Sequence, residues 1–201
     1  MVHPLIIAHR GFSSERPENT ISSFDHAFNN GFNLLELDVH LSSDGVLVVM
    51  HDEKVDRTTN GTGFLKSMTY KEISQLDAGS WFRGTDEVSY TGQVVPSLDQ
   101  FLSRYSSKVH VFIEIKSLEE ELIDKLKERL SAYGLIPKIS SERLDIPGTS
   151  IISFNRAQIT LSARAMPTVG HGLLVIKPTE DHIRFCVDNQ IKGLFPNIHF
   201  L

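Results

Sequence analysis

The chain has 201 residues, 40% of them apolar, which is enough to bury one substantial core. A formal net charge of −5 gives no support to nucleic-acid binding, and there is no block of Lys or Arg. No stretch is long and apolar enough for a signal peptide or a membrane span, so we expect a cytoplasmic protein. The single cysteine, Cys186, permits no internal disulfide and is predicted to be a core thiol.

The first elements expected are a strand and a helix. A short apolar run predicts a strand at 5–9 that stops at His9-Arg10-Gly11. This places an imidazole and a fixed cationic side chain at the end of the strand. The helix that follows has Thr20 as its predicted N-cap and ends at Gly31.

Two further apolar runs, at 34–39 and 46–51, are separated by too few residues for a parallel crossover. An Asp-Gly turn dipeptide lies between them, so they are predicted to form a hairpin. Glu36 and Asp38 are two residues apart and therefore share one face of the first arm. Counting outward from the turn brings Asp38 roughly opposite His51. On these residues alone, a metal or acid–base site and an ordinary exposed strand are about equally favoured.

After the hairpin, residues 53–106 are irregular, with short helical pieces that begin at the capping boxes of Thr69 and Ser97. Such a long excursion usually carries function, as a lid or a substrate pocket. Trp81 and Phe82 are expected either to line that pocket or to anchor the excursion to the rest of the fold.

From residue 109 onward, strands alternate with helices, a pattern typical of a parallel sheet or barrel. The strands are expected at 109–115, 150–154, near 173–176 and near 193–198. The helices are expected after a capping box at Ser117-x-x-Glu120 and up to Gly134, at 157–166 after Asn155, and at 180–189 after Thr179. The first of these strands carries Glu114 and Lys116 at its end, so three strands deliver charge to what can be one rim.

These charged strand ends belong to longer motifs. They read HRGFSSERPENT at 9–20, ELDVHLSSDG at 36–45, HDEKVDRTTNGTG at 51–63 and IEIK at 113–116. Three further motifs read LDAGSWF at 76–82, VPSLDQFL at 95–102 and IISFN at 151–155. In this order and spacing, the chain resembles the glycerophosphodiester phosphodiesterase family over nearly its whole length.

The resemblance implies an α/β fold, a TIM-type (β/α)8 barrel of the phosphatidylinositol-phospholipase-C-like type, with active-site groups at the carboxyl ends of its strands. It makes residues 1–201 one barrel domain, with 53–106 as an inserted subdomain over the active site. Six staves can be counted, so the last two β/α units are expected to be lacking. Open edges near Ile6 and Leu194 would then favour self-association, a less stable chain or weak activity.

Three carboxylates are candidate metal ligands: Glu36, Asp38 and Glu114. Their hard oxygen atoms suit one divalent cation, Mg²⁺ or Ca²⁺, better than zinc, because no cysteine or histidine with ligand spacing accompanies them.

Two histidines, His9 and His51, are the candidate acid–base pair: one takes a proton from the attacking oxygen and the other protonates the leaving alkoxide. The candidate substrate-binding residues are Arg10, Lys116, Glu18 and Asn19. The first two supply positive charge for a phosphate.

The resemblance implies that a glycerophosphodiester such as glycerophosphocholine, a small molecule, is hydrolysed to glycerol 3-phosphate and an alcohol. One alternative is a truncated barrel that is weakly active or inactive and only binds phosphodiesters or a partner. A second is a metal-dependent amide hydrolase, which is disfavoured because that chemistry normally requires His-x-His where this chain has His9-Arg10.

Overall fold

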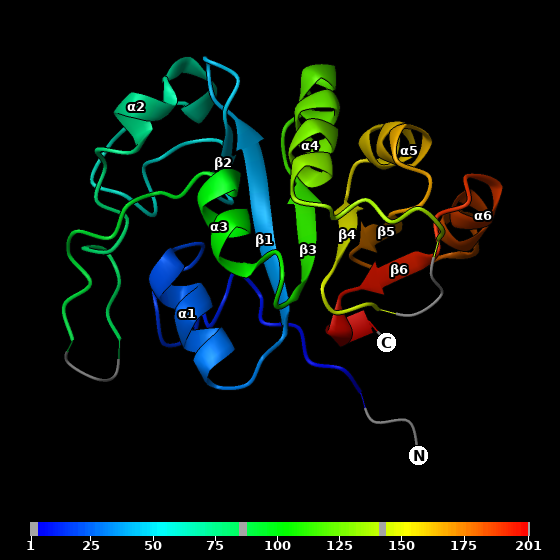
Figure 1. Cartoon of the computed structure of the whole chain (residues 1–201), viewed down its shortest axis with the longest axis horizontal. Coiled ribbons are helices and arrows are strands. Elements are labelled where there is room, and N and C mark those ends of the chain that lie inside the picture. Colours follow the sequence, from blue (N-terminus) through cyan, green and yellow to red (C-terminus); the bar gives the residue numbers. More distant parts are fainter. Residues whose placement is uncertain (1–3, 85–87, 141–143, 201) are drawn as a thin grey trace.

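The computed structural model describes residues 4–84, 88–140 and 144–200 (Figure 1). Its strands are β1 (Leu34–Leu41), β2 (Leu47–Val49), β3 (His110–Ile115), β4 (Gly148–Ser153), β5 (Gly170–Val175) and β6 (Gly193–Pro196). They form one six-stranded sheet in the order β2-β1-β3-β4-β5-β6. The β1–β2 pair is antiparallel and the other pairs are parallel, so the predicted hairpin and the predicted parallel sheet are both confirmed.

The helices are α1 (Ile21–Asn29), α2 (Tyr70–Ile73), α3 (Leu98–Tyr105), α4 (Glu120–Ala132), α5 (Arg156–Ala165) and α6 (Glu180–Asp188). Two 3-10 turns, Leu65–Ser67 and Ile198–Phe200, complete the regular structure of the described ranges. Five predicted N-caps are confirmed, because each side chain accepts a hydrogen bond from a backbone N–H three residues later; they are Thr20, Thr69, Ser97, Asn155 and Thr179.

Helices α1, α3, α4, α5 and α6 cover one face of the sheet (Figure 1). Alternate strand residues such as Leu35 and Ile113 are fully buried beneath them, against Phe24 of α1 and Leu122 of α4. The intervening strand residues point to the other face, where Phe112 belongs to a smaller apolar cluster. Parallel strands covered on one face by helices are the arrangement of the predicted (β/α)8 barrel. The described strands form part of such a barrel, because their sheet does not close on itself.

The strand expected at 5–9 is reduced to a single bridge between Ala8 and Leu35. Ala8 donates its N–H to the Leu34 carbonyl and accepts the N–H of Glu36, at 2.9 Å each. Towards the carboxyl end of β1 the same edge is paired with β2. The chain turns away from this edge at Arg10, whose φ is positive, at 55°.

The predicted capping box at Ser117 is wrong. The Ser117 hydroxyl accepts the N–H of Leu41 at 3.2 Å and lies 3.0 Å from Nδ1 of His40, so it bridges β1 instead of capping a helix. Helix α4 begins at Glu120 without a side-chain cap, and its predicted end is confirmed by Gly134, whose φ is +68°.

Residues 53–106 divide into two parts. The earlier part encloses a second apolar cluster together with β2; its members are Val48, Met50, Val55, Leu65, Ile73, Ala78 and Val95. Helix α3, by contrast, packs into the principal core. Trp81 donates its ring N–H to the Ala78 carbonyl at 2.9 Å, which anchors this ring within the excursion. A lid function for 53–106 stays a prediction.

Two expectations from composition can be compared with the structure. Cys186 is buried in the principal core, as predicted, and burial raises the pKa of its thiol. In the described ranges, no helix combines the length and apolar character needed to cross a membrane.

Candidate active site

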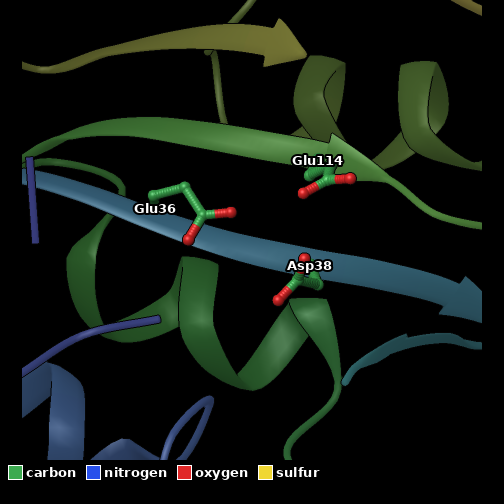
Figure 2. Close-up of side chains that lie close together, drawn as sticks. All are labelled: Glu36, Asp38 and Glu114. Atoms are coloured by element: carbon green, nitrogen blue, oxygen red, sulfur yellow. The ribbon is translucent and has the colours of Figure 1, made fainter. Parts of the chain in front are cut away.

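The three candidate metal ligands come together on the face of the sheet opposite the helices. Figure 2 shows Glu36 and Asp38 on β1 and Glu114 on β3 with their carboxylates facing a common space. The parallel register places Asp38 directly beside Glu114. One oxygen from each of the three lies within 4.8 Å of the others, which is compatible with metal–oxygen distances of about 2.0–2.6 Å to one shared cation.

All three carboxylates are buried, which makes their charges costly. Burial, and next the charge of Asp38, holds the pKa of Glu36 well above its usual range. Burial likewise raises the pKa of Glu114 to about 7, against the opposing effect of Lys116. Oδ1 of Asp38 is buried and has no hydrogen-bond partner among the residues that the structure describes. A buried, unpaired acceptor beside two carboxyl groups with raised pKa values fits a divalent cation.

Two cationic side chains lie against the acidic cluster. Lys116 Nζ is 2.8 Å from Glu114 Oε1 and 3.8 Å from Asp38 Oδ1. Arg10 Nε is 3.1 Å from Asp38 Oδ2, and the backbone N–H of Arg10 donates to Glu36 Oε2 at 2.9 Å. These contacts hold both cationic groups against the three carboxylates.

Arg10 and Asn19 both adopt left-handed backbone conformations, with φ of 55° and 57°. Such strain costs about 1–3 kcal/mol and is found mainly at functional sites. Asn19 donates its backbone N–H to the Arg10 carbonyl at 3.0 Å and its side-chain Nδ2–H to Asp38 Oδ2 at 2.8 Å. Asn19 therefore positions Asp38, and the two strained residues support each other.

The two candidate catalytic histidines line one cavity of about 410 Å³. His9 Nε2 lies 3.9 Å from Glu36 Oε2, and burial followed by the Arg10 charge lowers the pKa of His9. Arg10 and Glu114 line the same cavity, whose remaining walls are largely apolar: Ile7, Phe112, Ile152, Phe154, Leu174 and Phe195. A small polar molecule bound here would contact both imidazoles and the acidic cluster.

The expected pairing of Asp38 with His51 is off by one residue. Met50 donates its N–H to the Asp38 carbonyl at 3.1 Å, so His51 lies one position beyond. The reason is the turn: Ser42 bonds to Val46, which centres the loop on Asp44 rather than between Asp44 and Gly45.

Three residues around His51 were not predicted as part of the site. His40 Nε2 donates to the His51 carbonyl at 3.0 Å, Asp52 accepts from the His51 ring, and Arg57 binds Asp52. A signal for the last two was present in the charged run HDEKVDR at 51–57. His40 gave none, because its role depends on the approach of Ser117.

Glu18, a predicted substrate-binding residue, already binds two arginine side chains. Its oxygens accept hydrogen bonds from Arg10 at 3.1 Å and from Arg57 at 2.8 and 2.9 Å. These bonds to Arg57, acting against burial, lower the pKa of Glu18. The structure brings all nine predicted site residues into one neighbourhood, and their roles stay predictions.

Comparison with known proteins gives this site a family context. The chain is 38% identical over 176 residues to a glycerophosphodiester phosphodiesterase of Bacillus subtilis, an alignment that covers 82% of this chain. It is 47% identical over 132 residues to one from Caldanaerobacter subterraneus, covering 62% of this chain. These alignments cover 57% and 53% of the two relatives, so the chain spans little more than half of their length.

A solved structure of a phosphodiesterase from Oleispira antarctica, in complex with the product sn-glycerol-3-phosphate, superposes with a TM-score of 0.82. It shares 31% sequence identity, and the match covers 98% of this chain and 76% of that one. The sequence matches the glycerophosphoryl diester phosphodiesterase family over residues 9–195, which include every predicted site residue. The chain therefore belongs to the glycerophosphoryl diester phosphodiesterase family.

Proposed function

We propose that the protein hydrolyses glycerophosphodiesters such as glycerophosphocholine to glycerol 3-phosphate and an alcohol. One observation carries the proposal: two imidazoles, two cationic side chains and three buried carboxylates converge beside a cavity of about 410 Å³. Membership of the family and the likeness to a phosphodiesterase with bound sn-glycerol-3-phosphate support it.

In this proposal, Glu36, Asp38 and Glu114 hold one Mg²⁺ or Ca²⁺. When bound, the cation polarises a phosphoryl oxygen and offsets the charge of the carboxylates. Arg10 and Lys116 donate hydrogen bonds to the phosphate and orient it. One of His9 and His51 removes the proton of the attacking oxygen, and the other protonates the leaving alcohol oxygen.

The test is product formation from glycerophosphocholine, followed by phosphorus NMR. The protein is first treated with a chelator and then assayed with and without Mg²⁺ or Ca²⁺. We expect glycerol 3-phosphate only in the presence of metal, and no product from Glu36→Gln. The matched control is Glu121→Gln, which changes an exposed glutamate of α4 and leaves the site intact.

A folded protein that binds metal and substrate but releases no product would contradict the proposal. That outcome would instead support the alternative function, a barrel that binds phosphodiesters without cleaving them.

We also infer that the chain associates with itself through open sheet edges. In the described residues β6 pairs only with β5. Leu5 and Ile6, just before the Ala8–Leu35 bridge to β1, are 69% and 67% exposed. Sedimentation over a range of concentrations tests this inference, with Ile6→Lys as the variant expected to weaken association. A protein that stays monomeric at every concentration would refute it.

A further inference from the structure

The ring of His51 is held from one side only. Its Nδ1 lies 2.5 Å from Oδ1 of Asp52, and in the described residues no group hydrogen-bonds to its Nε2. Hydrogen bonds from Arg57 keep the pKa of Asp52 far below its usual range, so this carboxylate is ionised and only accepts. The proton of a neutral His51 therefore sits on Nδ1, and Nε2 keeps its lone pair on a ring that lines the cavity.

Asp52 is itself fixed by a fork. Arg57 donates from Nε to Oδ2 at 2.7 Å and from Nη2 to Oδ1 at 2.9 Å. On its other side the same guanidinium meets Glu18, with Nη1 at 2.9 Å from Oε2 and Nη2 at 2.8 Å from Oε1. Two carboxylates thus grip one planar cation, a geometry that the single ammonium of a lysine cannot reproduce.

Glu18 carries the connection on to the acidic cluster. Its Oε1 also accepts from Arg10, whose Nε lies 3.1 Å from Asp38. Glu18 belongs to the loop after the first bridge and Arg57 to the excursion after β2, 39 residues further along the chain. The segment at 53–106 is therefore tied to the site through Arg57, which binds both Glu18 and Asp52, the hydrogen-bond partner of His51.

We propose that Asp52, Arg57 and Glu18 form a positioning clamp that holds the His51 imidazole in its Nδ1–H tautomer, with Nε2 directed at the substrate. The inference rests on the proposed function for its catalytic meaning, but the tautomer itself can be measured without substrate. Asp52, Arg57 and Glu18 are positioning residues, since they act through His51.

A purely structural role for the same contacts makes a different prediction. Arg57 has a side chain 44% exposed to solvent, and ion pairs at such positions contribute little to stability. If the clamp only fastened the excursion, its loss would cost little and would leave kcat unchanged. If it positions His51, its loss lowers kcat at least about 10-fold, the lower end of the range for partners that orient a metal-ligating histidine, with little change in KM.

The experiment combines nitrogen-15 NMR of the histidine rings with kinetics on glycerophosphocholine. His51 is assigned by the signals that disappear in His51→Ala. We expect the wild-type ring in the Nδ1–H form, and a mixture of tautomers in Arg57→Gln and Asp52→Asn. Arg57→Lys, which keeps the charge and loses the fork, should lie between wild type and Arg57→Gln in kcat.

Arg104→Gln is the matched control. Arg104 also donates from Nε and Nη2 to one carboxylate, that of Asp25, at 2.7 and 2.6 Å, and its side chain is 51% exposed. This variant loses an equivalent fork on α3, so it should keep the His51 tautomer and wild-type kcat.

A wild-type His51 in the Nε2–H form would overturn the proposal, and so would an Arg57→Gln protein with the tautomer and kcat of Arg104→Gln. If no variant hydrolyses glycerophosphocholine, the proposed function fails while the ring spectra still decide the clamp. If Arg57→Gln does not fold, the wild-type spectrum and Arg57→Lys decide it.

Discussion

Two cavities of about 410 Å³ each lie towards opposite ends of the strands, one at the amino ends and one at the carboxyl ends. They differ in chemistry rather than size. Strand β3 contributes to both, with His110 at its amino end and Glu114 at its carboxyl end. His110 and His171 at the amino end are buried, and both ring nitrogens of each have a hydrogen-bond partner within reach.

At the carboxyl end the buried carboxylates destabilise one another. Carboxylates adjoin one another, Oδ1 of Asp38 has no donor within the described ranges, and the pKa values of Glu36 and Glu114 are raised. Stability alone would favour satisfying or replacing such groups. Of two equal cavities, the one whose polar groups are unsatisfied is therefore the better candidate for function.

The largest effect is expected from the imidazoles at the carboxyl end. His9→Ala and His51→Ala should each lower kcat for glycerophosphocholine by about 10²–10⁴-fold, because in the proposed mechanism each removes a group that transfers a proton. His26→Ala is the control, since His26 lies on α1 and bonds to Glu15 outside the cavity. Wild-type turnover by His51→Ala would remove His51 from the acid–base pair.

The next effect concerns the carboxylates. Glu36→Gln should abolish the heat of Mg²⁺ or Ca²⁺ binding in a calorimetric titration. It should also raise the stability of the metal-free protein, because a neutral amide has neither the cost of a buried charge beside Asp38 nor that of the proton uptake that avoids it. A gain of about 1 kcal/mol corresponds to a melting temperature higher by about 2–4 °C. A lower melting temperature without metal would show that the three carboxylates are not in conflict.

At the amino end, the pH dependence of stability should expose a buried neutral histidine. Burial lowers the pKa of His171 from the ordinary value of 6.5 to about 4. Between these values the unfolded chain binds a proton that the folded chain does not, so the free energy of unfolding falls as the pH falls through this window.

Urea unfolding measures this effect at about pH 7 and about pH 5. His171→Gln should reduce the acid loss of stability by about 1–2 kcal/mol relative to wild type. Taking the difference between the two proteins cancels the opposite contribution of Glu36 and Glu114, whose raised pKa values favour the folded state on acidification. Equal losses in both proteins would mean that His171 is not held neutral.

The smallest effect tests the one exception at the amino end. Thr149 lines that cavity, and in the described part of the chain its buried hydroxyl has no hydrogen-bond partner. Thr149→Val keeps the shape and removes the unpaired hydroxyl, so we expect a change of about 0–1 kcal/mol in the stabilising direction. A loss above about 1 kcal/mol would show that the hydroxyl is paired in solution, for example to water.

The sequence by itself determined the features that depend on near neighbours. Alternation put Glu36 and Asp38 on one face of β1, and side chains such as Thr20 and Asn155 marked where helices begin. These features need only the geometry of a strand or of one helical turn, which is why local patterns predict them.

Only the tertiary structure decided how distant segments meet. Parallel pairing set Glu114 beside Asp38, and a turn centred on Asp44 shifted His51 by one position. Ser117 contacts His40 instead of capping the helix that follows it. The fork between Arg57 and Glu18 likewise joins residues 39 apart. Such contacts depend on strand register and on which segments pack together, and these depend on the whole core rather than on any short stretch of sequence.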